Sequence, residues 1–122
     1  MSNIDYKSAG VDIDAGNKAV DRIKDGVKST FTSNVLTGLG SFGSLYDLKP
    51  ILEKYDHPVM VQSIDGVGTK TIIARKLGKF DTIGIDLLSA AANDILVMGA
   101  RPLTFLDYIA NDKLKPKIVE EI

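Results

Sequence analysis

The sequence predicts an α/β domain, or α+β in the broader usage, because strand-like and helix-like stretches follow one another along the chain. Residues 58–65 and 103–109 are rich in β-branched or aromatic side chains, which is the composition of strands. Residues 69–77 and 82–98 have helical patterns of apolar residues, and a glycine follows each of them. We therefore expect one domain in which two strands and two helices dominate the second half.

The overall composition is that of an ordinary globular domain. The 122 residues are 44% hydrophobic and 25% charged, which excludes disordered, collagen-like and coiled-coil classes. Fifteen Lys and Arg against 16 Asp and Glu give a net charge of −1, so we expect no nucleic-acid partner. The chain has no cysteine, which excludes disulfides, thiolate catalysis and cysteine-based metal sites.

The amino-terminal residues lack the apolar core of a signal peptide, and the chain lacks an uncharged apolar window of about 18 residues for a membrane span. We therefore predict a cytoplasmic protein with no membrane partner.

The first half of the chain predicts three modest elements. Apolar spacing from Val20 onward predicts a helix over about residues 17–24, with Gly26 near its end and irregular chain before it. A glycine-rich loop then leads to a short strand at 42–48. Residues 51–57 form one helical turn or a loop.

The two predicted helices in the second half of the chain have clear sequence signals at their ends. Gly78 and Gly99 stand where the helices 69–77 and 82–98 require C-caps. A last helix begins around Pro116, but its apolar stripe has only started when the sequence stops. We therefore expect residues 1–122 to be a domain that is incomplete at its carboxyl-terminal end.

The sequence Asp65-Gly-Val-Gly-Thr-Lys70 lies between a predicted strand and a predicted helix. Its glycines let backbone N–H groups face a ligand, the helix N-terminus adds positive potential, and Lys70 adds a cation, so the segment suits a phosphate. The carboxylate of Asp65 suits a magnesium ion bound to that phosphate. The alternative is a plain connection in which Asp65 caps the helix. The order of residues is not that of a Walker A loop.

Asp94 is predicted to lie on the apolar stripe of the helix 82–98. The helical neighbours that define this stripe are Leu87, Ala90, Ala91, Val97 and Met98. A carboxylate there needs a cation, a backbone donor or the edge of a cleft, because an unpaired buried charge is too costly. A partner Lys or Arg is the alternative. Together with Asp65, Asp94 makes a two-carboxylate magnesium site possible.

Three weaker features leave alternatives open. Asp107 lies within an apolar strand and lines the same cleft or points to solvent. Residues 38–43 spell G-x-G-x-x-G, the fingerprint of a dinucleotide-binding oxidoreductase domain, although no solid apolar strand precedes them and Pro50 interrupts the helix that should follow. A noncatalytic dimerisation module is the third possibility, with the strand 103–109 as its pairing edge.

Six ordered blocks of the chain together resemble one enzyme family, the phosphoribosylformylglycinamidine cyclo-ligases or aminoimidazole ribonucleotide synthetases. The blocks are Tyr6–Asn17, Gly38–Gly43, Asp65–Lys70, Asp81–Asp86, Asn93-Asp94 and Gly99–Tyr108. The resemblance implies ATP-dependent ring closure of formylglycinamidine ribonucleotide to aminoimidazole ribonucleotide in purine biosynthesis, with release of ADP and phosphate. Such phosphoryl transfer needs positioning and charge neutralisation more than a nucleophilic side chain.

The resemblance also implies roles for individual residues. Asp65 and Asp94 would hold magnesium on the ATP phosphates. The residues expected to contact ATP itself are Lys7, Asp14, Asn17, Gly66, Gly68, Thr69, Lys70 and Asp107. The segment 7–17 would fold over the nucleotide, and the loop 38–43 would lie near the bound ligands.

The fold implied by the resemblance is the amino-terminal ATP-binding domain of this family, a mixed sheet with helices on one face. Its strands would join those of a second subunit in a shared barrel, which makes a homodimer the expected assembly. Members of the family continue through a Gly-Gly-Glu-Thr-Ala type segment into a second α/β domain, and neither is present in these residues. We therefore expect a fragment that keeps much of the nucleotide surface without turning over substrate alone.

Overall fold

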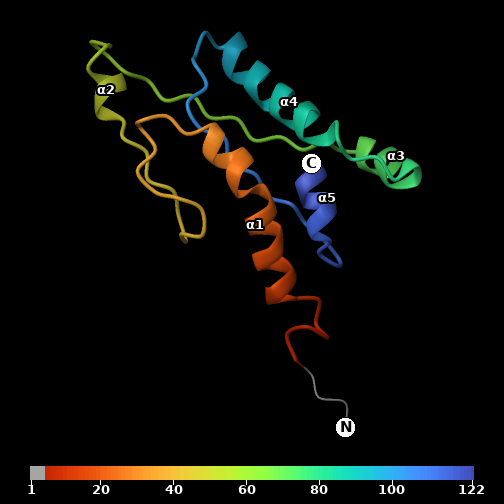
Figure 1. The fold of residues 1–122 in the computed structure, drawn as a ribbon. Helices are drawn as coiled ribbons and strands as arrows, with labels where there is room; N and C mark the ends of the chain where they lie inside the picture. The colour runs from red at the N-terminus through yellow and green to blue at the C-terminus, as the bar shows by residue number, and fades with distance from the viewer. Residues whose placement is uncertain (1–4) are drawn as a thin grey trace. The chain divides into compact units, whose positions relative to one another are not determined.

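The computed structural model describes residues 5–122 (Figure 1). Five helices occupy the described residues: α1 (Ile13–Ser29), α2 (Lys49–Leu52), α3 (Lys70–Leu77), α4 (Ile83–Val97) and α5 (Pro116–Glu121). The chain divides into two compact units. The first contains the residues up to 58 together with 111–120, and the second contains 59–110 together with 121–122.

Helix α1 is longer than the predicted 17–24 at both ends. It begins early because Asp12 is its N-cap: the Asp12 side chain accepts a hydrogen bond of 3.0 Å from the Ala15 backbone N–H. Asp14 in the first turn and Lys28 in the last turn both complement the helix dipole. The expectation of irregular chain before residue 17 is therefore wrong for 13–16 and confirmed for 5–12, and Gly26 lies inside the helix instead of ending it.

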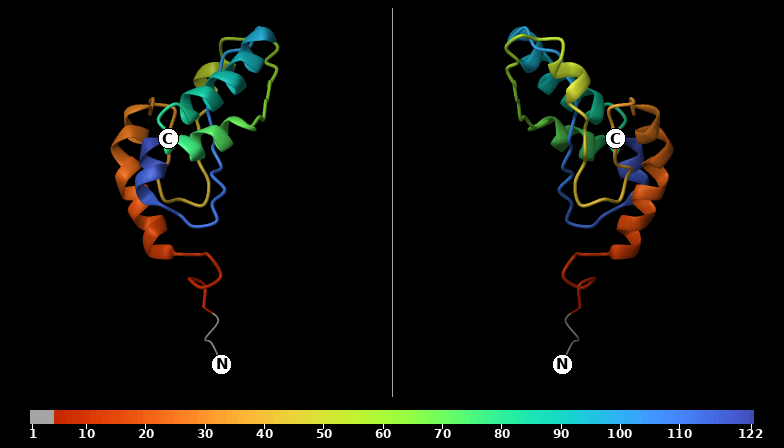
Figure 2. Two further views of the ribbon diagram at one scale, coloured as in Figure 1. Left: turned by 90° about the vertical axis from the view of Figure 1, so that its right-hand side faces the viewer. Right: turned by 90° about the vertical axis from the view of Figure 1, so that its left-hand side faces the viewer.

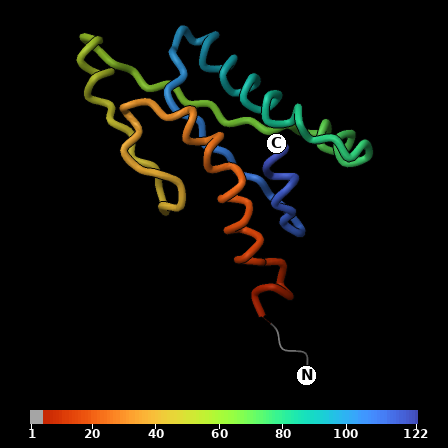
Figure 3. The backbone as a smooth tube through the Cα atoms, in the orientation of Figure 1, coloured from red at the N-terminus to blue at the C-terminus, as the bar shows by residue number. Residues whose placement is uncertain are grey.

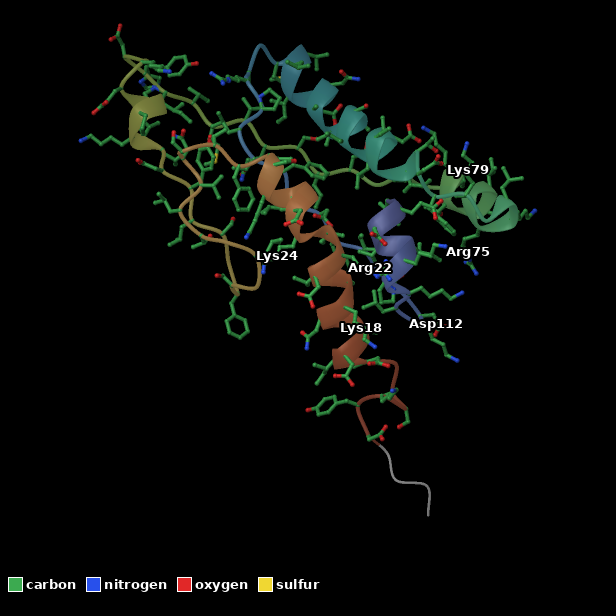
Figure 4. The ribbon with its side chains drawn as sticks, in the orientation of Figure 1. Lys18, Arg22, Lys24, Arg75, Lys79 and Asp112 are labelled. Carbon is green, nitrogen blue, oxygen red and sulfur yellow. The ribbon has the colours of Figure 1, made fainter. Side chains whose placement is uncertain are left out.

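The first unit packs α1 against the chain around α5. Arg22 of α1 forms an ion pair with Glu120 of α5, and Figure 4 shows Arg22 on the side of α1 that faces α5. Ala19 is the buried residue of α1. Gly10 has φ +95°, and a Cβ at this position would lie 3.4 Å from the carbonyl oxygen of Asp112, so a glycine is needed there.

Residues 31–48 form a loop closed by one antiparallel bridge, between Val35 and Tyr46. Two backbone hydrogen bonds flank it, from Leu36 N–H to the Leu45 carbonyl at 2.8 Å and from Asp47 N–H to the Asn34 carbonyl at 2.7 Å. The predicted strand 42–48 is thus reduced to a single bridge. The one-turn helix α2 follows directly, two residues earlier than the stretch 51–57 in which a turn or a loop was expected.

In the second unit the two predicted helices are confirmed. Helix α3 ends at Leu77, and Gly78 with its left-handed φ of +63° is the expected C-cap. Helix α4 ends at Val97 with Met98 as its C-cap, so the predicted cap Gly99, which has a positive φ of +73°, lies one residue further along. The two helices pack against each other (Figure 2). A Cβ at Gly84 of α4 would collide with the carbonyl oxygen of Ile122, so the approach of the last residue to α4 requires a glycine.

The segments 58–65 and 103–109 are not strands in the described residues. Both run without helical turns, as the backbone tube in Figure 3 shows. Strand-forming side chains do not make a strand unless a second backbone pairs with the segment in a regular ladder, and residues 5–122 contain no such ladder at either segment. Their apolar side chains stay in contact with solvent: Ile64 is 98% and Leu106 is 78% exposed.

Within residues 5–122, no helix is long and apolar enough to cross a membrane.

Candidate functional site

The ten predicted site residues fall in both units. Lys7, Asp14 and Asn17 belong to the first unit. The others belong to the second unit: Asp65, Gly66, Gly68, Thr69, Lys70, Asp94 and Asp107.

The glycine-containing turn before α3 is open and is not capped by Asp65. Asp65 Oδ1 accepts a hydrogen bond from the adjacent Gly66 N–H at 2.6 Å, and the N-cap position of α3 belongs to Thr69, whose side chain makes no capping bond. Gly68 has φ +65°, a conformation that favours glycine, and nothing lies within 4 Å of where its Cβ would be. The capping alternative is therefore wrong, and the amino-terminal end of α3 is free of side-chain caps.

Lys70, the first residue of α3, is held by a carboxylate of α4. Its ammonium nitrogen lies 2.7 Å from Asp86 Oδ2 and 2.8 Å from Asp86 Oδ1, so both carboxylate oxygens contact one charge. The Lys70 side chain is 62% exposed and that of Asp86 is 36% exposed. The cation that the sequence predicted for a phosphate is thus paired with Asp86 in this structure.

Asp94 is exposed on α4, and the prediction that it lies on a buried stripe is wrong. Val97 and Met98 of this stripe are 82% and 69% exposed, and its other three members are half-buried. Asp94 Oδ2 accepts a hydrogen bond of 2.9 Å from the Ser63 hydroxyl. This hydroxyl takes the place of the Lys or Arg partner that the sequence left open.

The Ser63 contact places the chain before the glycine turn beside α4. Ser63 and Asp65 are two residues apart, the spacing that puts side chains on one side of an extended chain. Sequence reasoning missed both Ser63 and Asp86 as partners of predicted site residues. The i, i+2 spacing from Asp65 was a signal for Ser63, whereas nothing in the sequence pairs Asp86 with a lysine 16 residues earlier.

The candidate residues of the first unit surround the start of α1. Lys7 Nζ lies 3.2 Å from Asp12 Oδ2. The hydrogen bond from the Ala15 N–H holds the pKa of Asp12 below its usual value, and Lys7 lowers that pKa further. Asp14 and Asn17 are exposed and three residues apart, which places them on one face of the helix.

Comparison with known proteins identifies the relatives of this chain. Residues 50–122 match the family described as AIR synthase related protein, N-terminal domain. The chain belongs to this family. It is 53% identical over all 122 residues to the phosphoribosylformylglycinamidine cyclo-ligase of Carboxydothermus hydrogenoformans, and 57% identical over 109 residues, 89% of this chain, to that of Xanthomonas campestris pv. campestris. It covers 35% and 31% of these two proteins, so it spans about a third of their length.

Membership of the AIR synthase N-terminal family confirms the resemblance found in the sequence, and it does not favour the dinucleotide-binding alternative. The geometry of the loop 38–43 agrees, because the loop is closed by the bridge between Val35 and Tyr46 and leads into the single turn of α2. A dinucleotide fingerprint instead joins a strand directly to a crossover helix.

The carboxylates of the second unit suit a magnesium ion that is coordinated partly by the protein and partly by the phosphates of a bound nucleotide. In the part of the chain that the structure describes, no three His, Asp or Glu side chains form a metal-binding group. Magnesium at nucleotide sites uses one or two carboxylates together with phosphate oxygens and waters. Asp65, Asp94 and Asp107 are all exposed, so their carboxylates are open to solvent.

Proposed function

We propose that this chain is the nucleotide-binding part of a phosphoribosylformylglycinamidine cyclo-ligase. The activity would be ATP-dependent closure of formylglycinamidine ribonucleotide to aminoimidazole ribonucleotide, with release of ADP and phosphate. The observation that carries the proposal is the 53% identity over all 122 residues to a protein of that name. A domain-level likeness alone would support a fold and not a reaction.

In this proposal the turn before α3 receives the phosphates of ATP. The amides of Gly66, Gly68 and Thr69 and the ammonium of Lys70 would anchor them. The support is local: Gly68 gives the turn its positive φ, the space beside Gly66 and Gly68 is open, and no side chain caps α3. An uncapped helix N-terminus favours an anion.

Asp65 and Asp94 would hold magnesium on those phosphates, and the exposure of both carboxylates supports the assignment. When bound, the ion would neutralise charge on the transferring phosphoryl group. The Ser63 hydroxyl occupies Asp94 Oδ2, so it orients that carboxylate and leaves Oδ1 for the metal.

The proposed reaction requires the chain to position the substrates and to neutralise the charge on the phosphates. The formyl amide oxygen of the substrate would take the γ-phosphoryl group of ATP, releasing ADP. An amidine nitrogen of the open-chain substrate would then attack the activated formyl carbon and displace phosphate, closing the ring with loss of a proton. Neither step needs a nucleophilic side chain, which agrees with a site built from glycines, carboxylates and one lysine.

The remaining predicted contacts complete the proposal. Lys7, Asp14 and Asn17 would close over the nucleotide, Asp107 would border it, and the loop 38–43 would lie near the bound ligands. A homodimer with a shared barrel would pair 58–65 and 103–109 as strands with those of the second subunit. The apolar side chains exposed along both segments, such as Ile64 and Tyr108 at 98% and 90%, support such a cover.

Calorimetric titration of the 122-residue chain with ATP, with and without magnesium, tests the proposal. We expect saturable binding that magnesium strengthens, and we expect Asp94→Asn to remove the magnesium-dependent part, a loss of about tenfold or more. The matched control is Asp25→Asn on the exposed side of α1, which should leave binding unchanged.

A second arm of the experiment uses NAD and a ring-closure assay. Binding of NAD in preference to ATP, or ATP binding that ignores magnesium, would contradict the proposal. The relatives are about three times longer than this chain, so we expect the 122 residues to bind nucleotide without measurable ring closure.

A further inference from the structure

We propose that Asp86 is a built-in counter-ion that competes with the nucleotide for Lys70 and thereby sets the affinity of the site. The inference rests on the proposed function, in which Lys70 anchors phosphate. It adds a positioning residue that acts through Lys70, placed on a different helix.

The contact between the two side chains is close and involves both carboxylate oxygens. Lys70 Nζ lies within 2.8 Å of each Asp86 oxygen. The ammonium donates a hydrogen bond to Asp86 Oδ1 and lies in ion-pair contact with Oδ2, so the carboxylate compensates its charge. A phosphate approaching the turn before α3 therefore meets a lysine whose charge is already compensated.

Lys70 is the mobile member of the pair. Asp86 lies in the first turn of α4, where the helix dipole favours a carboxylate, and its short side chain is 36% exposed. Lys70 is 62% exposed and carries its charge on a four-carbon stem. When the pair opens, the ammonium moves and the carboxylate stays on α4.

The spacing along α4 shows why the pair must open for binding. Asp86 and Asp94 are eight residues apart on one helix, which corresponds to about 12 Å at a rise of about 1.5 Å per residue. A phosphate whose magnesium is held at Asp94 is thus about two helical turns from Lys70 in its paired position. Lys70 reaches that phosphate by leaving Asp86.

The size of the effect follows from the exposure of the pair. Breaking an ion pair between largely exposed side chains changes an equilibrium by about two- to fivefold. Removing the Asp86 charge should therefore tighten binding of ATP by about that factor. Because the competition is electrostatic, the gain should shrink as the salt concentration rises.

The test compares single and double variants by titration with magnesium and ATP at low and high salt. Asp86→Asn, which keeps the shape of the side chain, should tighten binding about two- to fivefold at low salt. Asp81→Asn is the matched control: it removes the same charge from an exposed pair, Lys79 with Asp81 at 3.8 Å, and should leave affinity unchanged. In a Lys70→Met background, Asp86→Asn should have no effect.

The outcomes separate this inference from the proposed function. Unchanged or weaker binding by Asp86→Asn, while Lys70→Met still weakens binding, overturns the counter-ion and leaves the nucleotide site standing. A gain that persists in Lys70→Met is a general charge effect and also overturns it. Absence of ATP binding by the unsubstituted chain contradicts both. Asp86→Ser should reproduce the gain, so that a folding defect in one variant does not decide the result.

Discussion

The charged side chains of the two units make different kinds of contact. In the first unit Asp12 caps α1, and Arg22 of α1 pairs with Glu120 of α5. In the second unit neither α3 nor α4 has a side-chain cap, and polar contacts run from Lys70 to Asp86 and from Ser63 to Asp94. A charged side chain thus starts a helix in the first unit, whereas in the second unit the side chains of Lys70 and Asp94, both proposed to bind ligand, take partners from other segments.

The helices differ in their apolar faces as well. Helix α1 buries Ala19 within a mostly polar sequence, whereas the apolar helix α4 has no buried residue. Ile85 and Leu96 of α4 are 68% and 55% exposed. Apolar surface of this kind marks an interface, so α4 gains more than α1 from the cover that the proposed dimer would provide.

The largest effect expected from this contrast is at Ser63. Ser63→Ala removes the hydroxyl that orients Asp94, and we expect magnesium-dependent binding of ATP to weaken about tenfold. Titration with Mn²⁺, followed by its electron spin resonance, reports the metal site directly. Ser63→Thr should restore binding because it keeps the hydroxyl.

Ser89→Ala is the control for this prediction, because Ser89 is an exposed serine on α4, the helix that carries Asp94. Equal effects of the two substitutions, or an effect of Ser63→Ala on binding of ATP without metal, would mean that Ser63 acts on the fold of the second unit and not on Asp94.

A smaller effect is expected at Asp12, and it should change stability with pH. The pKa of Asp12 is lowered in the folded chain, first by the Ala15 N–H and then by Lys7. The stabilising contribution is therefore complete above the ordinary aspartate value of 3.8 and is lost as the pH falls through the lowered value. The protection factor of the Ala15 amide, measured by NMR hydrogen exchange and normalised to the intrinsic rate at each pH, should fall in that acidic range.

Asp12→Asn keeps a good N-cap without a titrating group, so it should remove the acid sensitivity of Ala15 exchange while preserving α1. Asp12→Ala should lose the cap at every pH. Acid sensitivity that survives in Asp12→Asn would assign it to another carboxylate, such as Asp5, whose pKa is lowered by hydrogen bonds from Ser8.

Sequence patterns predicted those elements that depend on interactions between residues close together in the chain. The helices α3 and α4 and the glycine Gly78 follow from spacing and from the left-handed C-cap, and the start of α1 was missed although Asp12 and Asp14 are ordinary start signals. The strand predictions used composition, which does not supply a partner backbone. The contacts of Lys70 and Asp94 join residues 16 and 31 positions apart, beyond the reach of periodicity.

The smallest expected effect is at the ion pair between Arg22 and Glu120. Their side chains are 50% and 43% exposed, so solvent screens the pair and its coupling energy should be about 0.5 kcal/mol or less. A double-mutant cycle with Arg22→Met and Glu120→Gln, read from urea unfolding, measures it. Neither substitution should alter ATP affinity, in contrast to Asp86→Asn. A coupling well above 1 kcal/mol would show that this contact holds α5 on α1 more firmly than its exposure implies.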